Sequence, residues 1–512
     1  MAHGHVLVVC DADRVIAVFM LTTLAATSLL VAASFRLEHF TATLLAAYIA
    51  LVAETSAVTL ALSPFREVRR GPLALSEVAL LILALIVWWR RGKPGLGIAL
   101  GARAIAAAAR DPVVVVFLAV VALALAYELV LVLTVPSNNW DSLTYHLARV
   151  AAWVQHGGVS WIPNAPTDRM NEFQPLAEQE ILFLFVATGK GALFALPQYV
   201  AQFAILVAIY GAARRLGYAA ACASLFFATF SLVALEATTS QNDLVAASFP
   251  VAAAALLLSG GTAEVVLAGI AVGLGLGVKL TTALVLPVLV VLAWRLGRRR
   301  TFIFVGASGA AFVALGMWSF VLNIAKTGHL LGNGGGRVEN TASPSLTRGL
   351  STAYRLLHRL LDLTGFSSWT VRGLVLAGWI GAGAAVLVLR RRNGAPLEIG
   401  LAVLAILLPL AAPTLIASFS SLLLSIGGTV HLPAFDPINE RVNEDLSAFG
   451  PLAGPAVIGL SAYSLALAIR QRGDMRRVAW RWVSPSCASL LSSSRRPRTT
   501  RGSRGSSSSQ SP

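Results

Sequence analysis

The chain has 512 residues, of which 56% are hydrophobic and only 12% are charged, and its mean hydropathy is +0.74. These values exclude an ordinary soluble globular protein, because apolar runs of about twenty residues, the length needed to cross a bilayer, recur along the chain. The formal net charge of +16 does not indicate nucleic-acid binding, because the basic residues gather at the ends of the apolar runs, where they orient membrane helices.

The apolar runs predict an all-α polytopic membrane protein with about 13 transmembrane helices. They are too long and too continuously apolar for the strands of a membrane barrel. The first run has the full length of a span and lacks a small-residue cleavage site, so we expect it to stay in the protein. The expected spans are residues 14–35, 42–63, 73–89, 113–136, 191–213, 217–236, 241–258, 263–278, 280–296, 301–322, 371–389, 398–425 and 447–469.

Five basic clusters predict the orientation of these helices, because all five fit one cytoplasmic face. The same alternation places the turn with Arg66, Arg69 and Arg70 outside, although basic residues favour the cytoplasmic side. Two orientations therefore remain for the first three helices. The clusters are Arg90, Arg91, Lys93, Arg103 and Arg110; Arg214 and Arg215; Arg298 to Arg300; Arg390 to Arg392; and Arg470 to Arg477. The connections expected on the extracytoplasmic face, with short interfacial helices, are residues 137–180, 237–242, 323–370 and 426–446.

Four regions follow from this organisation. The last of them is rich in Ser and Arg and cannot bury a core, so we expect a disordered basic tail. The regions are N-terminal membrane helices with a basic cytoplasmic linker (1–112), a transmembrane half that includes the outer loop 137–180 (113–325), an outer loop with C-terminal helices (326–470) and the tail (471–512).

The first polar stretch of interest is "NNWDSLTYHLARVAAWVQHGG", Asn138 to Gly158. Its apolar residues recur at helical spacing from Ser142 to Gln155, which predicts a short helix at the outer interface. Asp141 stands where an N-cap belongs, a role worth about 1 kcal/mol. The other interpretation is a catalytic carboxylate, favoured by the side chains that share its loop: Trp140, Tyr145, Trp153, Trp161, Asp168, Arg169, Asn171, Glu172 and Gln174.

Two further stretches are more polar than their positions require. In "EATTSQNDLVAAS", seven polar residues from Glu236 to Asp243 occupy a minimal turn between expected spans. Asn242 or Asp243 would cap the next helix in one interpretation, and these residues would have a functional role in the other. In "GLGLGVKLTTALVLP", Lys279 lies at an outer-facing position between apolar runs. Lys279 either snorkels to the interface or binds the phosphate of a lipid substrate. The glycines of "GNGGGR" lack the Lys-Ser/Thr continuation of a phosphate-binding P-loop and are expected to be flexible.

Taken in order, "NNWDSLTYHLARVAAWVQHGGVSWIP", "TTSQNDLVAASF" and "GLGLGVKLTTAL" resemble membrane glycosyltransferases of the GT-C class. The resemblance covers roughly residues 136–325, and it implies that the transmembrane half formed by residues 113–325 is catalytic. It is strongest to the branch of the protein O-mannosyltransferases and lipid A aminoarabinose transferases, and to related bacterial proteins of uncertain substrate. It implies a multi-pass protein of the bacterial inner (plasma) membrane.

The resemblance implies transfer of a sugar from a polyprenyl-phosphate donor to an extracytoplasmic glycan, lipid or protein acceptor, with inversion. The expected partners are this donor, this acceptor and the lipid bilayer, without nucleic acid. The resemblance places the catalytic aspartate at Asp141 and a second acidic position at Asp243. One carboxylate would act as general base, and cations would bind the leaving phosphate. Candidate substrate-binding residues are Tyr145, His146, Arg149, Glu172, Gln241, Asn242, Lys279 and Arg337.

Metal use and catalysis itself have alternatives. Many relatives carry an Asp-Glu pair at the first site, whereas Ser142 follows Asp141, so a divalent metal cofactor stays an open alternative. A transporter or lipid flippase would use Glu54, Glu77 and Glu128, which lie within apolar spans, as ion sites. The chain shows no clear inverted repeat, and its polar residues favour outer loops over the middle of the bilayer. A third reading is a catalytically inactive scaffold for envelope assembly, since resemblance to a family does not establish activity.

Overall fold

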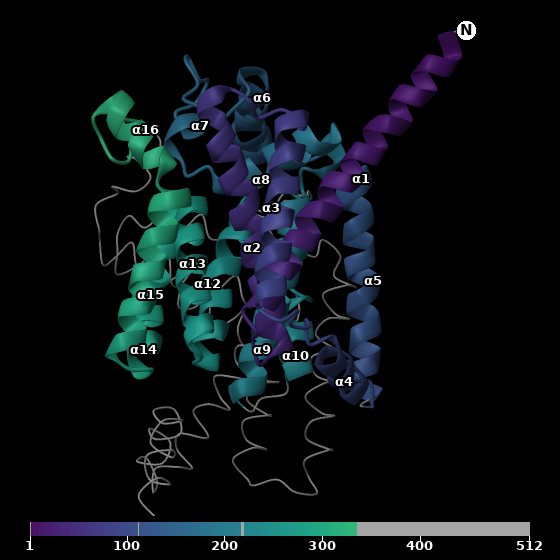
Figure 1. Cartoon of the computed structure of the whole chain (residues 1–512), viewed down its shortest axis with the longest axis vertical. Helices are drawn as coiled ribbons and strands as arrows, with labels where there is room; N and C mark the ends of the chain where they lie inside the picture. The colour runs from purple at the N-terminus through teal and green to yellow at the C-terminus, as the bar shows by residue number, and fades with distance from the viewer. Residues whose placement is uncertain (1, 111, 217–219, 335–512) are drawn as a thin grey trace, which may run out of the picture. The chain divides into compact units, whose positions relative to one another are not determined.

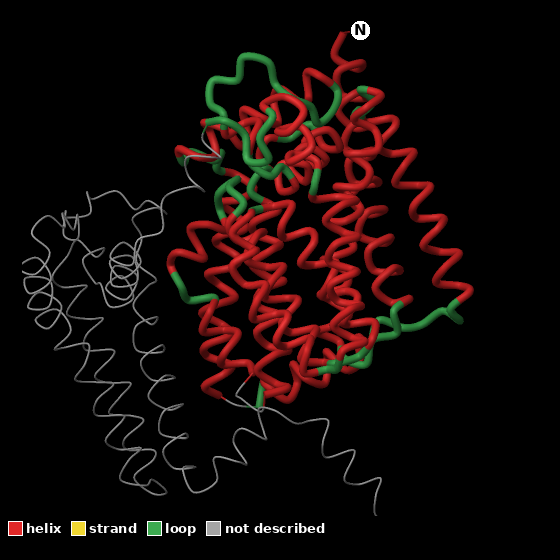
Figure 2. The backbone as a smooth tube through the Cα atoms, turned by 90° about the vertical axis from the view of Figure 1, so that its left-hand side faces the viewer, coloured by secondary structure: helices red, strands yellow, loops and turns green. Residues whose placement is uncertain are grey.

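The computed structural model describes residues 2–110, 112–216 and 220–334. These residues form helices and connecting loops, with no strand among them (Figure 2). The helices are α1 (Ala2–Ser34), α2 (Phe40–Leu62), α3 (Arg70–Arg90), α4 (Ile98–Ala108), α5 (Pro112–Thr134), α6 (Leu147–His156), α7 (Arg169–Glu172), α8 (Leu176–Thr188), α9 (Leu196–Leu216), α10 (Ala220–Phe227), α11 (Ser231–Ala237), α12 (Asp243–Ser259), α13 (Thr262–Val278), α14 (Leu286–Arg295), α15 (Arg298–Ala311) and α16 (Trp318–Thr327).

Apolar helices of membrane-spanning length confirm a multi-pass membrane protein. Four helices in the described part are long and apolar enough to cross a bilayer, and a bent pair of helices with an angle of 58° brings the number to five. Thirteen spans are not confirmed, because several of the expected spans are shorter helices in the structure. The tail and three of the expected spans lie outside the described residues, and these spans are 371–389, 398–425 and 447–469. The four long helices are Arg14–Ser34, Phe40–Phe65, Arg70–Arg90 and Gly191–Leu216, and the bent pair is Arg298–Gly316 with Trp318–Thr327.

The expected span 217–236 is wrong as one continuous helix. Two short helices, α10 and α11, take its place, and the chain between them leaves helical geometry at Phe230, whose φ of −72° and ψ of 118° are extended. The Thr229 hydroxyl donates a hydrogen bond to the Phe226 carbonyl over 2.7 Å, a local bond of the kind that competes with helix continuation. Helices α4 and α8 were not expected. Glu178, Gln179 and Glu180 interrupt the apolar sequence of α8, so its hydropathy does not indicate a membrane span.

Helices α2, α9, α12 and α13 contribute most of the main apolar core, which also includes Leu289 and Ala293 of α14 and Phe304 of α15. Helices α13 and α15 approach closely, because a Cβ atom on Gly269 would lie 2.6 Å from the Phe304 carbonyl oxygen and one on Gly273 would lie 2.6 Å from the Phe312 nitrogen. Small residues allow this close backbone packing between membrane helices. The packing fixes the C-terminal end of α13, where Lys279 follows.

The two ends of the bundle carry different residues. Helices α6, α7 and α16 lie at one end and α4 lies at the other (Figure 1). The Val68 amide donates to the Gly157 carbonyl over 2.9 Å and the Val159 amide donates to the Ser63 hydroxyl over 2.8 Å, so the α2–α3 turn lies at the end that holds α6. At the α4 end, basic side chains from two of the predicted clusters, Arg103 and the pair that ends α9, line one hollow. The first three helices therefore follow the same alternation as the rest of the described bundle.

Candidate catalytic site

Asp141 lies within a helix and does not cap one. The helix begins at Trp140, passes through a π-helical turn at Ser142–His146 and continues as α6, after which Gly157 is the C-cap with a φ of 79°. Asp141 has a φ of −64° and a ψ of −40°, and its side chain makes no capping hydrogen bond. An N-cap residue needs non-helical backbone angles and a side-chain oxygen on the amides of the first turn. The predicted short helix is confirmed, and the capping interpretation of Asp141 is wrong.

The carboxylate of Asp141 instead faces a cation and a phenol. Its Oδ1 atom lies 3.4 Å from a terminal nitrogen of Arg169, and both side chains are 35% exposed. Its Oδ2 atom accepts a hydrogen bond from the Tyr145 hydroxyl over 3.4 Å. Both contacts are loose, so the carboxylate keeps free hydrogen-bonding capacity. The sequence contained Arg169 in the same loop but did not identify it as the partner of Asp141.

Tyr145 is buried between the polar residues of the site. Its ring centroid lies 4.0 Å from that of His146 and 5.7 Å from that of Phe173. Burial raises the pKa of the Tyr145 phenol, and the nearby carboxylates, led by Asp141 and including Asp243, raise it further. The phenol therefore stays neutral and available as a hydrogen-bond donor. Its π-helical turn is a rare geometry that often marks functional sites.

Asp243 is the first residue of α12, and neither its side chain nor that of Asn242 caps the helix. The N-terminus of α12 is capped from another helix, because the Gln198 side-chain oxygen accepts hydrogen bonds from the amides of Leu244 over 2.8 Å and Val245 over 3.1 Å. Asn242 occupies the N-cap position but makes no capping bond, and its amide donates to the Val278 carbonyl over 3.4 Å. The capping interpretation is wrong here too.

The carboxylate of Asp243 pairs with Lys279. The Lys279 ammonium lies 2.7 Å from Asp243 Oδ1, and the two side chains are 36% and 47% exposed respectively. Lys279 follows α13 directly, with extended backbone angles that direct the chain away from the helix axis. Because the ammonium is held by a carboxylate, simple snorkelling does not describe its position. The site thus contains a second pair of a carboxylate and a cation, both partly exposed.

Polar contacts join the three quoted stretches into one site. The Leu280 amide donates to the Gln174 side-chain oxygen over 3.3 Å, which connects the segment after Lys279 to the first loop. With its amide oriented so that the nitrogen faces carboxylates, Gln241 donates to Asp243 and to Glu236, each over 3.3 Å, and accepts a hydrogen bond from Asn139. The electrostatic influence of both Asp141 and Asp243 on Tyr145 agrees with this proximity.

His146 and Arg149 lie beneath the site around a glutamate that the sequence analysis missed. Glu178 Oε1 lies 2.7 Å from His146 Nδ1 and 3.2 Å from an Arg149 nitrogen, and all three side chains are buried. Burial opposes ionisation of Glu178, but the charges of Arg149 and His146 hold the pKa of its carboxyl below its usual range. A glutamate two residues into an apolar helix was the signal in the sequence.

Arg149 fixes the loop that carries Arg169. Its guanidinium donates to the backbone carbonyls of Met170 over 2.6 Å and Phe173 over 3.3 Å, and also to the carbonyl of Arg169. Each of the three guanidinium nitrogens therefore already has an acceptor within the chain, and the side chain is fully buried. These contacts position the loop, whereas Lys279 and Arg169 are the exposed cations of the site.

Glu172 anchors the beginning of the glycine-rich stretch. Its Oε1 atom accepts hydrogen bonds from the amides of Asn333 over 2.7 Å and Gly334 over 3.0 Å. A Cβ atom on Gly332 would overlap the Glu172 carboxyl group, so glycine is needed there for the close approach of the backbone. This part of the stretch is packed, contrary to the expectation of flexible glycines. Arg337 lies outside the described residues.

The residues that the structure describes contain no group of three or more His, Cys, Asp or Glu side chains arranged to hold a metal ion. Asp141 and Asp243 each face a basic side chain. Each of these carboxylates therefore has a cation at a place where a divalent metal would need further oxygen or nitrogen ligands.

The glutamates of the transporter alternative occupy two separate places in the bundle. Glu54 of α2 lies 3.5 Å from the Ser28 hydroxyl and interacts with Glu77 of α3, whereas Glu128 of α5 lies against Gln202 of α9. All three glutamates are buried. These positions correspond to contacts between neighbouring helices and do not form one ion site.

Comparison with known protein families gives a match over part of the chain. Residues 180–418 match the model of glycosyltransferase family 87, a family of the GT-C type. The matched segment contains Asp243 and Lys279 and begins after Asp141. No curated protein and no solved structure matches the chain. The match and the apolar helices support a membrane glycosyltransferase, which implies a sugar donor and an acceptor. They do not confirm the protein O-mannosyltransferase and aminoarabinose transferase branch.

Proposed function

We propose that the protein transfers a sugar from a polyprenyl-phosphate donor to an extracytoplasmic glycan, lipid or protein acceptor, with inversion, in the bacterial inner membrane. The observation that carries the proposal is the pair of partly exposed carboxylate–cation contacts, Asp141 with Arg169 and Asp243 with Lys279, at one end of a bundle of apolar helices. A lipid-linked sugar has its tail in the bilayer and its sugar and phosphate at the interface, which is where such groups would act.

Asp141 is the proposed general base. It takes the proton of the acceptor hydroxyl while that oxygen forms a bond to the anomeric carbon of the sugar, and the bond between this carbon and the phosphate oxygen breaks. The electron pair of the broken bond leaves with the phosphate. One displacement of this kind inverts the anomeric centre. The Tyr145 hydroxyl orients the carboxylate of Asp141 through its hydrogen bond.

Lys279 and Arg169 are the proposed phosphate-binding groups. Cations that stabilise charge as it develops on a leaving group lower the barrier of the displacement. Both side chains are partly exposed, and a phosphate can take one acceptor place now filled by a carboxylate. Asp243 keeps Lys279 in position through their 2.7 Å contact, and Gln241 supports Asp243 from the other side.

The test is sugar transfer by the full chain reconstituted in vesicles with a labelled polyprenyl-phosphate sugar. We expect transfer with an inverted anomeric configuration, and we expect Asp243→Asn to reduce it by about tenfold, because Lys279 loses the carboxylate that positions it. Glu67→Gln is the matched control, because Glu67 lies in the α2–α3 turn at the same end of the bundle and outside both ion pairs. Equal activity of the Asp243→Asn and Glu67→Gln variants would contradict the assignment.

The extracytoplasmic position of the site has its own test. Trp140 is 75% exposed at the site, and Arg299 is exposed at the opposite end, at the start of α15. In a variant with Cys10, Cys222 and Cys487 replaced by serine, a cysteine at position 140 should react with an impermeant thiol reagent in intact cells, and one at position 299 should not. The reverse labelling pattern would place the site on the cytoplasmic face and refute the proposal.

A further inference from the structure

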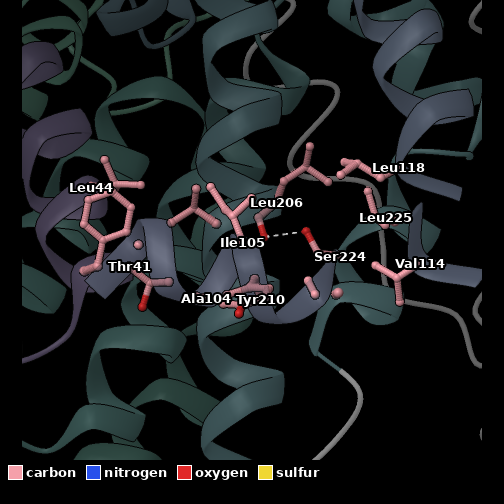
Figure 3. A pocket seen from close by; sticks show the side chains of 15 residues that line it. Thr41, Leu44, Ala104, Ile105, Val114, Leu118, Leu206, Tyr210, Ser224 and Leu225 are labelled. Atoms are coloured by element: carbon pink, nitrogen blue, oxygen red, sulfur yellow. Dashed lines mark hydrogen bonds between the residues drawn. The ribbon is translucent and has the colours of Figure 1, made fainter. Parts of the chain in front are cut away.

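A second cavity lies at the α4 end of the bundle, away from both aspartates. Its apolar part encloses about 250 Å³ between α2, α4, α5, α9 and α10. Side chains from these helices, including Leu44, Ile105, Leu118, Leu206 and Leu225, surround it (Figure 3). The Ser224 hydroxyl at its wall donates to the Leu206 carbonyl over 2.8 Å, so this polar group is already satisfied. The space therefore suits a hydrocarbon chain.

The apolar part continues into a basic part of about 710 Å³. The two parts share wall residues, among them Phe40, Gly101 and Tyr210. The wall of the basic part contains three arginines, Arg103, Arg214 and Arg215. His39 and Glu38 also line this part. A cavity that changes from apolar to cationic along its length matches the tail and the head of an anionic lipid.

Arg215 provides a second, independent indication that this cavity binds an anion. Its Nε and one terminal nitrogen are buried and make no hydrogen bond within the described residues, and its other terminal nitrogen donates to the Thr41 hydroxyl over 3.5 Å. Glu264 of α13 attracts Arg215 electrostatically but forms no ion pair with it in the part of the chain that is described. A buried cationic donor without an acceptor is costly, and a phosphate oxygen would satisfy it.

We propose that this cavity binds one anionic phospholipid, with the headgroup phosphate at Arg103, Arg214 and Arg215 and an acyl chain in the apolar part. This site is distinct from the donor site. Gln198 of α9 caps α12 beside Asp243, and Arg215 follows seventeen positions later on the same helix, a rise of about 25 Å. Juxtamembrane basic residues attract the anionic lipids of the nearer leaflet.

The experiment measures lipid retention by the full chain. The purified, delipidated protein is equilibrated with vesicles of equal parts phosphatidylglycerol and phosphatidylcholine, and bound lipid is counted by native mass spectrometry. We expect one phosphatidylglycerol per chain in preference to phosphatidylcholine. Retention should fall about fivefold for each arginine of the cavity changed to glutamine. Arg103→Gln and Arg214→Gln alter exposed side chains, so they keep the test valid if Arg215→Gln impairs folding.

Matched controls separate this site from general attraction to the membrane. Arg110→Gln removes an exposed charge just after α4 that does not line the cavity, and it should leave retention unchanged. Ala104→Trp should fill the junction of the two parts and abolish retention, whereas Ala106→Trp on the same helix should not, because Ala106 lines neither part. Equal retention of both lipids, equal loss from Arg110→Gln, or binding of added polyprenyl phosphate in place of phosphatidylglycerol would overturn the proposal.

Discussion

Replacement of Asp141 by Asn and by Ala tests whether its carboxylate serves chemistry or structure. The capping role would make the two variants differ, because Asn caps about as well as Asp and Ala costs about 1 kcal/mol. The observed Asp141 makes no capping bond, and its contacts with Arg169 and Tyr145 are 3.4 Å long and partly exposed. An ion pair of this kind is worth about 0–1 kcal/mol. We therefore expect both variants to unfold within about 1 kcal/mol of the wild type and of each other.

Sugar transfer should respond very differently from stability. Loss of a general base lowers the rate by about 10²–10⁴-fold, and both variants lose it. Binding of the lipid donor should stay within a few fold, because Lys279 and Arg169 remain. The assays are transfer of labelled sugar from polyprenyl phosphate and thermal unfolding of the same preparations. Near-normal transfer by the Asn variant would refute the catalytic assignment, and a large stability difference between the variants would refute the geometry from which it was inferred.

Three more perturbations follow from the described contacts. Lys279→Gln should weaken binding of polyprenyl phosphate by about tenfold, because it removes a charge-assisted contact. The control Lys190→Gln, which changes an exposed lysine, should leave this binding unchanged. Equilibrium binding of a labelled lipid measures both affinities. Gln198→Leu should lower the free energy of unfolding, measured by thermal unfolding, by about 1–2 kcal/mol, because two amides at the N-terminus of α12 lose their acceptor. Burial and nearby carboxylates raise the pKa of Tyr145, so the folded state keeps a proton that the unfolded state loses above about pH 10. The free energy of unfolding, measured by thermal unfolding at several pH values, should therefore fall as the pH rises beyond that value. The fall should be smaller in Tyr145→Phe.

The sequence predicted the helices whose apolar runs are uninterrupted. Residues 42–63 and 73–89 were expected as spans and appear as α2 and α3 with boundaries shifted by three residues or fewer. The short helix after Asp141 was also expected. Alternation of the expected spans put Asp243 and Lys279 on the same face, because α12 begins at Asp243 and α13 ends just before Lys279, but their direct contact was not predicted. Local periodicity and span order therefore contain much of the fold.

The capping pattern could not be predicted in the same way. A cap depends on the backbone angles of one residue and on which distant side chain reaches the helix end. Gln198 lies 46 positions before Leu244, and no local pattern connects them. Asp141 failed as a cap because the helix begins earlier, at Trp140, and a π-helical turn follows. Glu178 was missed for a related reason, since its partners His146 and Arg149 lie on another helix.

Because neither Asp141 nor Asp243 caps a helix, both carboxylates are available for the proposed chemistry. A carboxylate that caps a helix has its oxygen atoms occupied by backbone amides, which lowers its capacity to accept a proton. The structure satisfies the start of α12 with Gln198 and begins the helix of Asp141 one residue earlier, so neither aspartate is used for structure in this way. Their remaining partners are the cations that a phosphate would attract. We infer that donor binding weakens the contact between Arg169 and Asp141, so that the carboxylate is open to the acceptor hydroxyl once the donor is bound. This order predicts that Arg169→Gln weakens binding of labelled polyprenyl phosphate severalfold, whereas Lys190→Gln does not. Unchanged donor affinity of the Arg169→Gln variant would contradict the coupling.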